Sequence, residues 1–363
     1  MPRFLLRSGA FALALLTLSA CDSEVETPAT AAVYVGNQGI FSDNGGSVTR
    51  VDPVGGTATQ DAVPNLGGLV QSLVVSGDRL YTLLNFSDSF SANTGRIDVV
   101  DLETGQRTQQ IAVGTPRSLA IVGGVGYVSN FYTFSLTPVT FSTGRVGTPI
   151  RVGDNPEGVV AVGNRVYVAT WGDSNGNGGA GRDVRVVSTV NNAVVQTVDV
   201  GCDGPRALLV DGESEVWVFC TGRTVYDANF NVVSRTNGEA VVLDGGSGAV
   251  VARIPLATQL GTSALGQDAA FSARNGEAYA VVGTGLTRFD TRTNALAGRI
   301  EIGGADIGAV AYDDASDRLY LGRLDAASPF SADGDVTVHD RTGAEVGRYA
   351  AGVIPGSVAF RPR

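Results

Sequence analysis

The sequence predicts an all-β protein, a seven-bladed β-propeller closed by its C-terminal strand. A short strand unit recurs along the chain at intervals of 40 to 61 residues, and periods of this size indicate propeller blades or solenoid repeats. The strand that follows the unit has an aromatic residue at its centre in every repeat. The last unit, at residues 355–360, has no strand after it, whereas the first strand, at residues 32–35, has no unit before it. The two incomplete ends therefore complete one blade and close a ring.

Each strand of the repeat has its own signature. The first-strand unit begins at Val70, Pro116, Pro156, Pro205, Gly266, Asp306 and Pro355. The second strand is centred on Tyr34, Tyr81, Tyr127, Tyr167, Trp217, Tyr279 and Tyr320. Third strands often end in Asp before a Thr-Gly turn, and the fourth strand is exemplified by residues 194–200. The third strand is indistinct within residues 131–152, so six or eight blades are alternatives.

Stacking the blades explains these patterns physically. A four-stranded twisted sheet cannot bury both faces alone, and radial stacking buries them while leaving short edges. We therefore expect the central aromatics to pack between blades, and the Asp and Gly after the third strand to form turns. Closure by the terminal strand removes an open edge that would favour aggregation.

Composition excludes several classes of function. The formal net charge is −10, and the chain has no Lys. An acidic surface repels nucleic acid and anionic membranes, and the lack of Lys excludes a lysine Schiff base or a lysine-bound pyridoxal cofactor. The one histidine, His339, is expected as a strand residue, which argues against a multi-histidine metal site and against histidine-based catalysis. We predict no cofactor, no metal site and no catalytic residue.

The first thirty residues predict export and anchoring. Residues 1–20 have two arginines and then a short apolar run, typical of a signal peptide. They end in Leu-Ser-Ala before Cys21, which resembles the bacterial lipobox and implies an acylated, palmitate-bearing Cys21. An ordinary secretory leader with a chance cysteine is the alternative. Residues 21–30 form an acidic tether, and residues 31–363 form one propeller domain, expected to be monomeric.

The repeat also resembles a known family. The order Pro-x-x-Leu/Val-Ala, Tyr-Val, Val-x-Val-x-Asp, Thr-Gly and Val-Gly is similar to YncE-like propellers. The opening residues 34–41 and 44–48 resemble the propeller domain of Bacteroidetes surface lipoproteins, whose BtuG type captures cobamides beside a TonB-dependent transporter. The acidic residues after Cys21 are similar to the surface-export signals of such lipoproteins. The resemblance implies a lipid-anchored outer-membrane protein, at the cell surface rather than the periplasmic face, although Asp22 would indicate inner-membrane retention in enterobacteria.

One face of the propeller is expected to carry function. The loops between second and third strands share a face with the connections between blades, and they are long in five repeats: 37–46, 85–95, 171–182, 221–238 and 324–334. Long loops on a rigid scaffold often carry function. They and the corresponding blade-three loop contain Phe41, Phe86, Phe90, Phe131, Tyr132, Trp171, Tyr226, Phe230 and Phe330. Phe41, Phe131 and Trp171 are candidate ligand contacts, unless such aromatics fold under their own loops as satellite cores.

The second position of each first-strand unit is expected to ring the channel mouth on this face. The residues are Gln71, Arg117, Glu157, Arg206, Gln267, Ile307 and Gly356. The five polar side chains would form a ligand-binding ring. The alternative is an Arg–Glu salt-bridge plug that only seals the channel.

Two further motifs remain. Cys202 and Cys220 would meet on the long-loop face, where an exported protein permits a disulfide, with free thiols as the alternative. Residues 173–178 resemble the start of a calcium loop, but Val184 stands where the bidentate Glu would be. We therefore predict a flexible loop there.

The sequence thus favours a non-enzymatic, lipid-anchored binding protein of the cell envelope. Its ligand would be a small molecule, and the resemblance suggests a cobamide with a TonB-dependent transporter as partner. Two alternatives stay open: a protein-interaction scaffold that uses the same loops, and a propeller lyase or lactonase.

Overall fold

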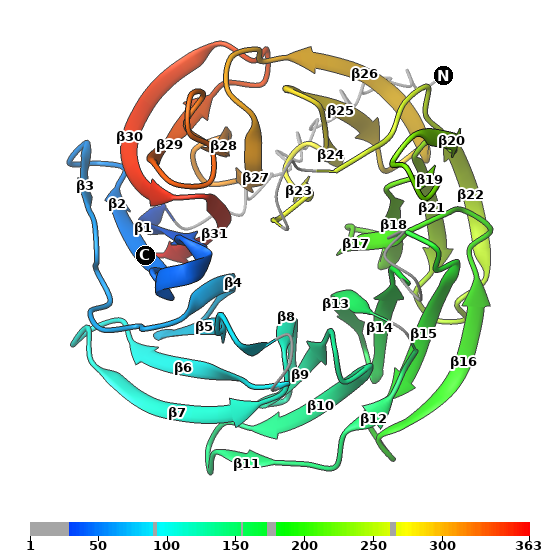
Figure 1. Cartoon of the computed structure of the whole chain (residues 1–363), viewed down its shortest axis with the longest axis horizontal. Helices are drawn as coiled ribbons and strands as arrows, with labels where there is room; N and C mark the ends of the chain where they lie inside the picture. The colour runs from blue at the N-terminus through cyan, green and yellow to red at the C-terminus, as the bar shows by residue number, and fades with distance from the viewer. Residues whose placement is uncertain (1–28, 90–92, 154, 173–178, 262–265) are drawn as a thin grey trace, which may run out of the picture.

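The computed structural model describes residues 29–89, 93–153, 155–172, 179–261 and 266–363. Seven sheets surround a central axis, as Figure 1 shows. The predicted signal peptide, the acylated Cys21, most of the tether, Phe90 and the segment 173–178 lie outside the described residues. None of the helices in the described ranges has the length and apolarity needed to cross a membrane.

Each blade is an antiparallel sheet whose strands follow one another from the central axis to the rim. Blade 1 contains β31 (Pro355–Pro362), β1 (Thr30–Asn37), β2 (Ser47–Asp52) and β3 (Thr57–Thr59). Blades 2 and 3 contain β4 (Leu69–Ser76), β5 (Arg79–Asn85), β6 (Gly95–Asp101), β7 (Arg107–Val113), β8 (Pro116–Val122), β9 (Val125–Asn130), β10 (Ser135–Thr140), β11 (Arg145–Val146) and β12 (Ile150–Arg151). Blades 4 and 5 contain β13 (Pro156–Val162), β14 (Arg165–Thr170), β15 (Asp183–Ser188), β16 (Ala193–Asp199), β17 (Pro205–Val210), β18 (Glu215–Cys220), β21 (Glu239–Asp244) and β22 (Val250–Pro255). Blades 6 and 7 contain β23 (Ala269–Ser272), β24 (Glu277–Val282), β25 (Gly285–Asp290), β26 (Ala295–Glu301), β27 (Ile307–Asp313), β28 (Arg318–Arg323), β29 (Asp333–His339) and β30 (Glu345–Val353).

Two smaller elements lie in the loops between second and third strands. The short helix η1 (Phe41–Asp43) belongs to blade 1. The hairpin of β19 (Thr224–Tyr226) and β20 (Val232–Arg235) belongs to blade 5 and is separate from its main sheet.

The predicted closure and the count of seven blades are confirmed. β31 pairs antiparallel with β1, so that Val358 lies opposite Val35 and Phe360 opposite Val33. The irregularity in blade 3 lies in its fourth strand, which is split into β11 and β12, while its third strand β10 is regular. Because the fourth strand is split, the strand pattern of that repeat is indistinct in the sequence.

The core lies between the blades, where the central aromatics of the second strands are buried. Tyr167 packs with apolar residues of both blade 4 and blade 5. Its hydroxyl donates to the Gly245 carbonyl, 2.9 Å away, in a turn of blade 5. The Tyr127 hydroxyl likewise bonds to the Asn192 side chain in a turn of blade 4, at 2.9 Å. These aromatics therefore hold neighbouring blades together and position the innermost strands around the axis.

Candidate functional site

The loops between second and third strands share a face with the connections that enter each blade. At this face the Phe131 amide donates to Thr115, Trp171 to Asn155, Thr221 to Gly204 and Leu324 to Asp306, with N···O distances of 2.8 to 3.1 Å. The innermost strands begin directly after these connections. Their first residues therefore surround one end of the central channel, which we call the channel mouth.

A bulge near the start of most innermost strands aims side chains into the mouth. The pairing with the second strand shifts register at this point in β4, β8, β13, β17, β27 and β31. A bulge inserts an unpaired residue and redirects its side chain. Gln71 and Arg206 are the inserted residues of β4 and β17, and Arg117 and Glu157 lie within the shifts of β8 and β13.

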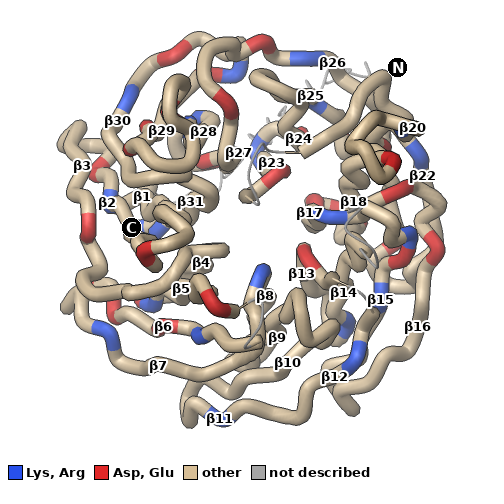
Figure 2. Tube along the Cα trace, viewed as in Figure 1, with Lys and Arg blue, Asp and Glu red and all other residues tan. Residues whose placement is uncertain are grey.

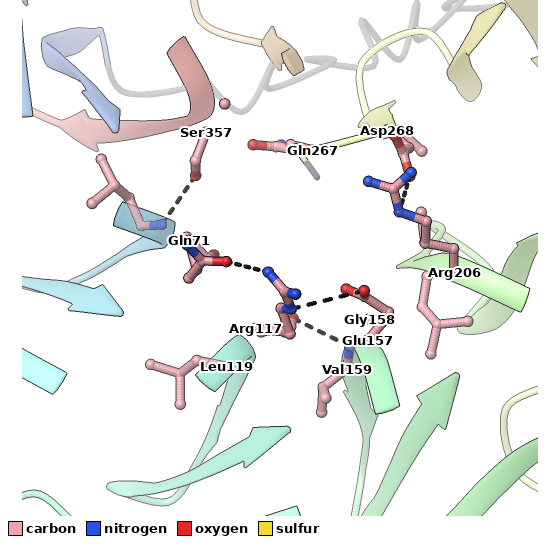
Figure 3. Close-up of a pocket in the computed structure, with 18 of the residues that line it drawn as sticks. Gln71, Arg117, Leu119, Glu157, Gly158, Val159, Arg206, Gln267, Asp268 and Ser357 are labelled. Carbon is pink, nitrogen blue, oxygen red and sulfur yellow. Dashed lines mark hydrogen bonds and ion pairs between the residues drawn. The ribbon is translucent and has the colours of Figure 1, made fainter. Parts of the chain in front are cut away.

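These four side chains line a cavity of about 240 Å³ at the mouth. Figure 2 shows charged residues at the inner ends of β8, β13 and β17 and near β23, around the axis. Figure 3 shows their side chains with Gln267, Asp268 and Ser357 around the same space. The structure thus brings together the five polar residues that the sequence placed at the mouth.

Arg117 is held on two sides. Its Nη1 donates to the Gln71 side-chain oxygen, and its guanidinium lies over the Phe131 ring, 4.5 Å from the centroid. Its Nε lies 3.9 Å from Glu157 Oε1, which is an ion-pair distance but too long for a hydrogen bond. Neither of these two buried atoms has a hydrogen-bond partner among the residues that the structure describes.

Arg206 pairs with Asp268, with 3.1 Å between Nε and Oδ2. Asp268 is only 2% exposed. Sequence reasoning missed it because it stands at the third position of its unit, next to Gln267. In other units that position holds Ser, Gly or Ala, so an acidic residue there was a usable signal.

Glu157 lies among charged neighbours from three elements. Burial raises the pKa of its carboxyl above the ordinary value, while Arg117 and Arg206 act in the opposite direction and Asp268 acts with the burial. The Glu157 backbone carbonyl accepts from the Ser129 hydroxyl at 2.6 Å. The strand therefore fixes its backbone position, while burial and the neighbouring charges together set the pKa of its carboxyl.

Backbone atoms close the other half of the mouth. Gln267 donates its backbone N–H to the Gly356 carbonyl at 2.9 Å, and its side-chain oxygen accepts from the Val358 amide at 3.1 Å. A Cβ on Gly266 would lie 1.8 Å from the Gly308 oxygen, so only glycine permits this approach. Gln267 thus ties blade 6 to β31 while it also lines the cavity.

The predicted position of Ile307 in the ring is wrong. Tyr320 of β28 pairs with Ala311, whereas Tyr167 of β14 pairs with Val160, three residues after Glu157. The equivalent residue in blade 7 is therefore Gly308, and Ile307 is fully buried.

The candidate aromatics lie in different environments. Phe131 is buried over Arg117, and its ring centroid is 6.4 Å from that of Trp171. Trp171 is partly buried, and its Nε1 donates to the Thr221 hydroxyl at 3.3 Å. Phe41 is 61% exposed on η1, and none of the three aromatics is among the residues that line the cavity.

The loop of blade 5 is braced beside the mouth. Cys202 and Cys220 form a disulfide with 6.1 Å between their Cα atoms, which joins the connection entering blade 5 to the end of β18. Thr221 donates to Gly204 and Gly222 to Asp203 at the same place, with N···O distances of 2.8 and 2.9 Å. This base supports the β19–β20 hairpin.

His339 lies away from the mouth, buried at the end of β29. Its Nδ1 is 2.9 Å from the Gly343 carbonyl, and its Nε2 is 2.9 Å from the Thr337 hydroxyl. Burial lowers the pKa of its imidazole. Within the described ranges, no three His, Cys, Asp or Glu residues are grouped so that they could hold a metal ion.

Comparison with known proteins adds the fold alone. No protein-family model matches this chain, and no curated protein sequence matches it. Among solved structures, the hydrazine synthase of Kuenenia stuttgartiensis aligns with a TM-score of 0.61 and 18% identity, over 80% of this chain and 89% of that chain. Apo AztD from Citrobacter koseri aligns with a TM-score of 0.56 and 13% identity, over 92% of this chain and 98% of that chain. The chain is therefore a seven-bladed β-propeller similar in structure to these two proteins, and the family suggested by its repeat remains a resemblance.

Proposed function

We propose that this chain is a binding protein that holds a small ligand at the channel mouth, on the long-loop face. The observation that carries the proposal is the cavity of about 240 Å³ at the mouth, which is lined by the polar side chains of Gln71, Arg117, Glu157, Arg206 and Gln267. Polar side chains that converge on such a cavity are typical of a ligand-binding site. A ring that served only to seal the channel would fill this space with its own side chains, whereas here the side chains surround a space that a ligand group can enter.

The cellular setting and the ligand follow from the resemblances in the sequence. The lipobox-like segment supports an acylated Cys21 and a lipid anchor in the outer membrane, with the protein at the cell surface. The similarity to BtuG-type lipoproteins supports a cobamide-like ligand and a TonB-dependent transporter as partner. A corrin ring is larger than the mouth cavity, so such a ligand would rest across the long-loop face with one peripheral group in the mouth.

Equilibrium binding of cyanocobalamin to the purified mature lipoprotein tests this proposal. We expect one ligand per chain, and a loss of affinity of about tenfold or more in Arg117→Ala, because a hydrogen bond to a charged group is lost. Arg292→Ala is the matched control, since the Arg292 side chain is 62% exposed and, within the described ranges, forms its ion pair with Asp290 at the surface. A mature protein that retains no cobamide would contradict the cobamide assignment.

A second candidate function is docking to another envelope protein through the β19–β20 hairpin. Tyr226, Phe230, Val232 and Val233 are exposed on this hairpin, and Phe230 is 86% exposed. Exposed aromatic clusters are typical of protein interfaces. Replacing Phe230 and Val233 with Ser should abolish co-purification of the partner and leave ligand binding unchanged. Unchanged co-purification would reject the hairpin as the contact.

A further inference from the structure

The segment that leads to the proposed anchor joins the propeller on the face opposite the mouth. β1 begins at Thr30 and runs to Asn37, where the long loop of blade 1 starts. Because Val33 lies opposite Val51, the start of β1 and the turn after β2 lie at the same end of blade 1. The Thr30 hydroxyl also donates to Asp313, at the end of β27, over 2.6 Å. We call this side the short-loop face, and it carries the turns between first and second strands and between third and fourth strands, such as those at 53–56, 77–78, 163–164 and 189–192.

The tether is too short to lay the mouth on a membrane. The proposed acylation site, Cys21, precedes Thr30 by nine residues, and nine residues span at most about 32 Å when fully extended. To bring the long-loop face onto a bilayer, the chain would first pass outward over β2 and β3, which takes about 10 Å. It would then follow the height of β1, whose eight residues add about 24 Å. The loop beyond Asn37 adds more, so the path exceeds the full reach of the tether.

Two turns of the short-loop face present apolar side chains to solvent. Val54, in a turn of blade 1, is 72% exposed, and Val190, in a turn of blade 4, is 78% exposed. The Val54 amide donates to the Asp52 carboxylate at 3.0 Å. The Val190 amide donates to the Ser188 hydroxyl at 3.3 Å, so in both turns the backbone is bonded within the turn. Blades 1 and 4 lie on opposite sides of the ring (Figure 1), and contact of both valines with a bilayer would lay the whole face on it.

The short-loop face carries charges of both signs. Arg361 pairs with Asp78, and Arg292 pairs with Asp290, with N···O distances of 3.1 and 3.3 Å. Hydrogen bonds from the backbone of its turn lower the pKa of Asp52, so this carboxylate is ionised at neutral pH. With a chain charge of −10, an anionic lipid surface would be repelled. This face therefore suits zwitterionic headgroups.

We propose that the lipid anchor holds the short-loop face against the bilayer, with Val54 and Val190 at zwitterionic headgroups, so that the channel mouth points away from the membrane. This inference rests on the lipid anchor of the proposed function. The exposed Phe41 and Phe230 of the long-loop face then point toward the medium. A ligand is captured from the side that faces away from the bilayer.

Single-cysteine reporters test this orientation in the acylated lipoprotein. The chain has three cysteines. Cys21 carries lipid on its sulfur in the proposed anchor, and Cys202 and Cys220 form the disulfide. An introduced cysteine is therefore the one free thiol that a maleimide fluorophore can label. The labelled proteins are reconstituted on phosphatidylcholine vesicles that contain a headgroup spin-labelled lipid as quencher.

Four exposed positions report on the two faces. Val54→Cys and Val190→Cys lie on the short-loop face, and Ser42→Cys and Ala228→Cys lie on the long-loop face. We expect both short-loop labels to lose emission to the quencher and both long-loop labels to keep theirs. Val190→Cys is the informative reporter, because blade 1 stays near the anchor in any orientation, whereas blade 4 meets the bilayer only when the whole face does.

The same reporters can overturn the inference. Quenching of Val54→Cys without quenching of Val190→Cys would mean that the propeller stands on its edge. Equal quenching of Val190→Cys and Ala228→Cys would mean that neither face is preferred. Stronger quenching of Ser42→Cys and Ala228→Cys would mean that the mouth faces the bilayer.

A longer tether is the matched variant. Inserting about 20 Gly-Ser residues after Thr27 adds about 70 Å of reach, which lets either face approach the bilayer. We expect the difference in quenching between Val190→Cys and Ala228→Cys to shrink. An unchanged difference would overturn tether length as the cause of the orientation.

Cyanocobalamin binding to the same vesicles separates this inference from the proposed function. Ligand binding with an edge-on or inverted propeller would overturn the inference alone. The expected quenching without ligand binding would support the inference and contradict the cobamide assignment. A mass spectrum without acyl chains on Cys21 would overturn the inference together with the proposed anchor.

Discussion

Glu157 makes the stability of the fold depend on pH. Its carboxyl is buried between Arg117 and Arg206, with Asp268 also facing it, and burial raises its pKa above the ordinary value of 4.5. The folded chain therefore holds this proton more tightly than the unfolded chain. Between the ordinary and the raised pKa the folded state binds more protons, so the free energy of unfolding falls as pH rises through that window. Below the window the neutral carboxyl has no such cost.

We therefore predict that Glu157→Gln gains stability relative to the wild type as pH rises above 4.5. Gln mimics the neutral carboxyl and does not ionise, so the variant lacks the cost that the wild type acquires. Urea unfolding of both proteins over a series of pH values measures the difference in unfolding free energy. A difference that stays constant with pH, or one that Glu103→Gln at an exposed turn reproduces, would show that Glu157 ionises in the folded state as it does in the unfolded chain.

At the scale of the element, the Cys202–Cys220 disulfide holds the hairpin base to its blade. The two cysteines are 18 residues apart in sequence. A cross-link over a loop of this size reduces the entropy of the unfolded chain and contributes about 3 kcal/mol. We predict that the double variant Cys202→Ala, Cys220→Ala loses about that much unfolding free energy. Both cysteines are buried, so Ala keeps the site apolar.

Reduction provides the control for this prediction. Dithiothreitol should lower the thermal midpoint of the wild type toward that of the double variant and should leave the variant itself unchanged. A variant as stable as the oxidised wild type would mean that the tight Thr221–Gly204 and Gly222–Asp203 contacts hold the hairpin base by themselves.

Elements that repeat could be predicted from the sequence, and local departures from the repeat could not. The recurring unit correctly placed Gln71, Arg117, Glu157 and Arg206 at the mouth, because the blades obey one geometry. In blade 7 the predicted unit was displaced by one residue, because the sequence there matches the repeat pattern in two registers. The pairing of β27 with β28 shows that Gly308, and not Ile307, takes the second position of the unit. The exposure of Phe41 also escaped prediction, since the conformation of its loop follows from contacts that no period encodes.

The contact of Gln267 with β31 is a second local feature that the repeat pattern does not predict. It depends on the approach of the Gly266 backbone to Gly308 and Gly356, from three blades that are distant in sequence. A glycine in the sequence shows that the backbone can approach another segment closely, but it does not show which segment. Here the closed ring determines that Gly266 approaches Gly308 and Gly356.

At the scale of the whole molecule, strands from both ends of the propeller domain, β1 and β31, pair with each other in blade 1. Val33 and Val35 of β1 and Val358 of β31 share one cluster with residues of blade 7. The two ends of the propeller domain also lie together, since the Arg363 amide donates to the Ala29 carbonyl at 2.7 Å. We therefore infer that the closed ring of blades would be retained if the N- and C-termini of the domain lay in another blade.

A circular permutant tests whether ring closure, rather than the position of the ends, determines the fold. A short Gly-Ser linker would join Arg363 to Ala29, and new ends would open in the exposed turn between Gly163 and Asn164. Because every strand pair is retained, we predict cooperative unfolding with a free energy within about 1 kcal/mol of the wild type. Truncation after Ile354 is the contrasting variant: it removes β31, exposes the buried side chains and backbone of β1, and should abolish the cooperative transition in a chemical denaturation experiment. If the truncated chain unfolds like the wild type, β31 does not close the ring in solution, and the mouth that it lines must be arranged differently.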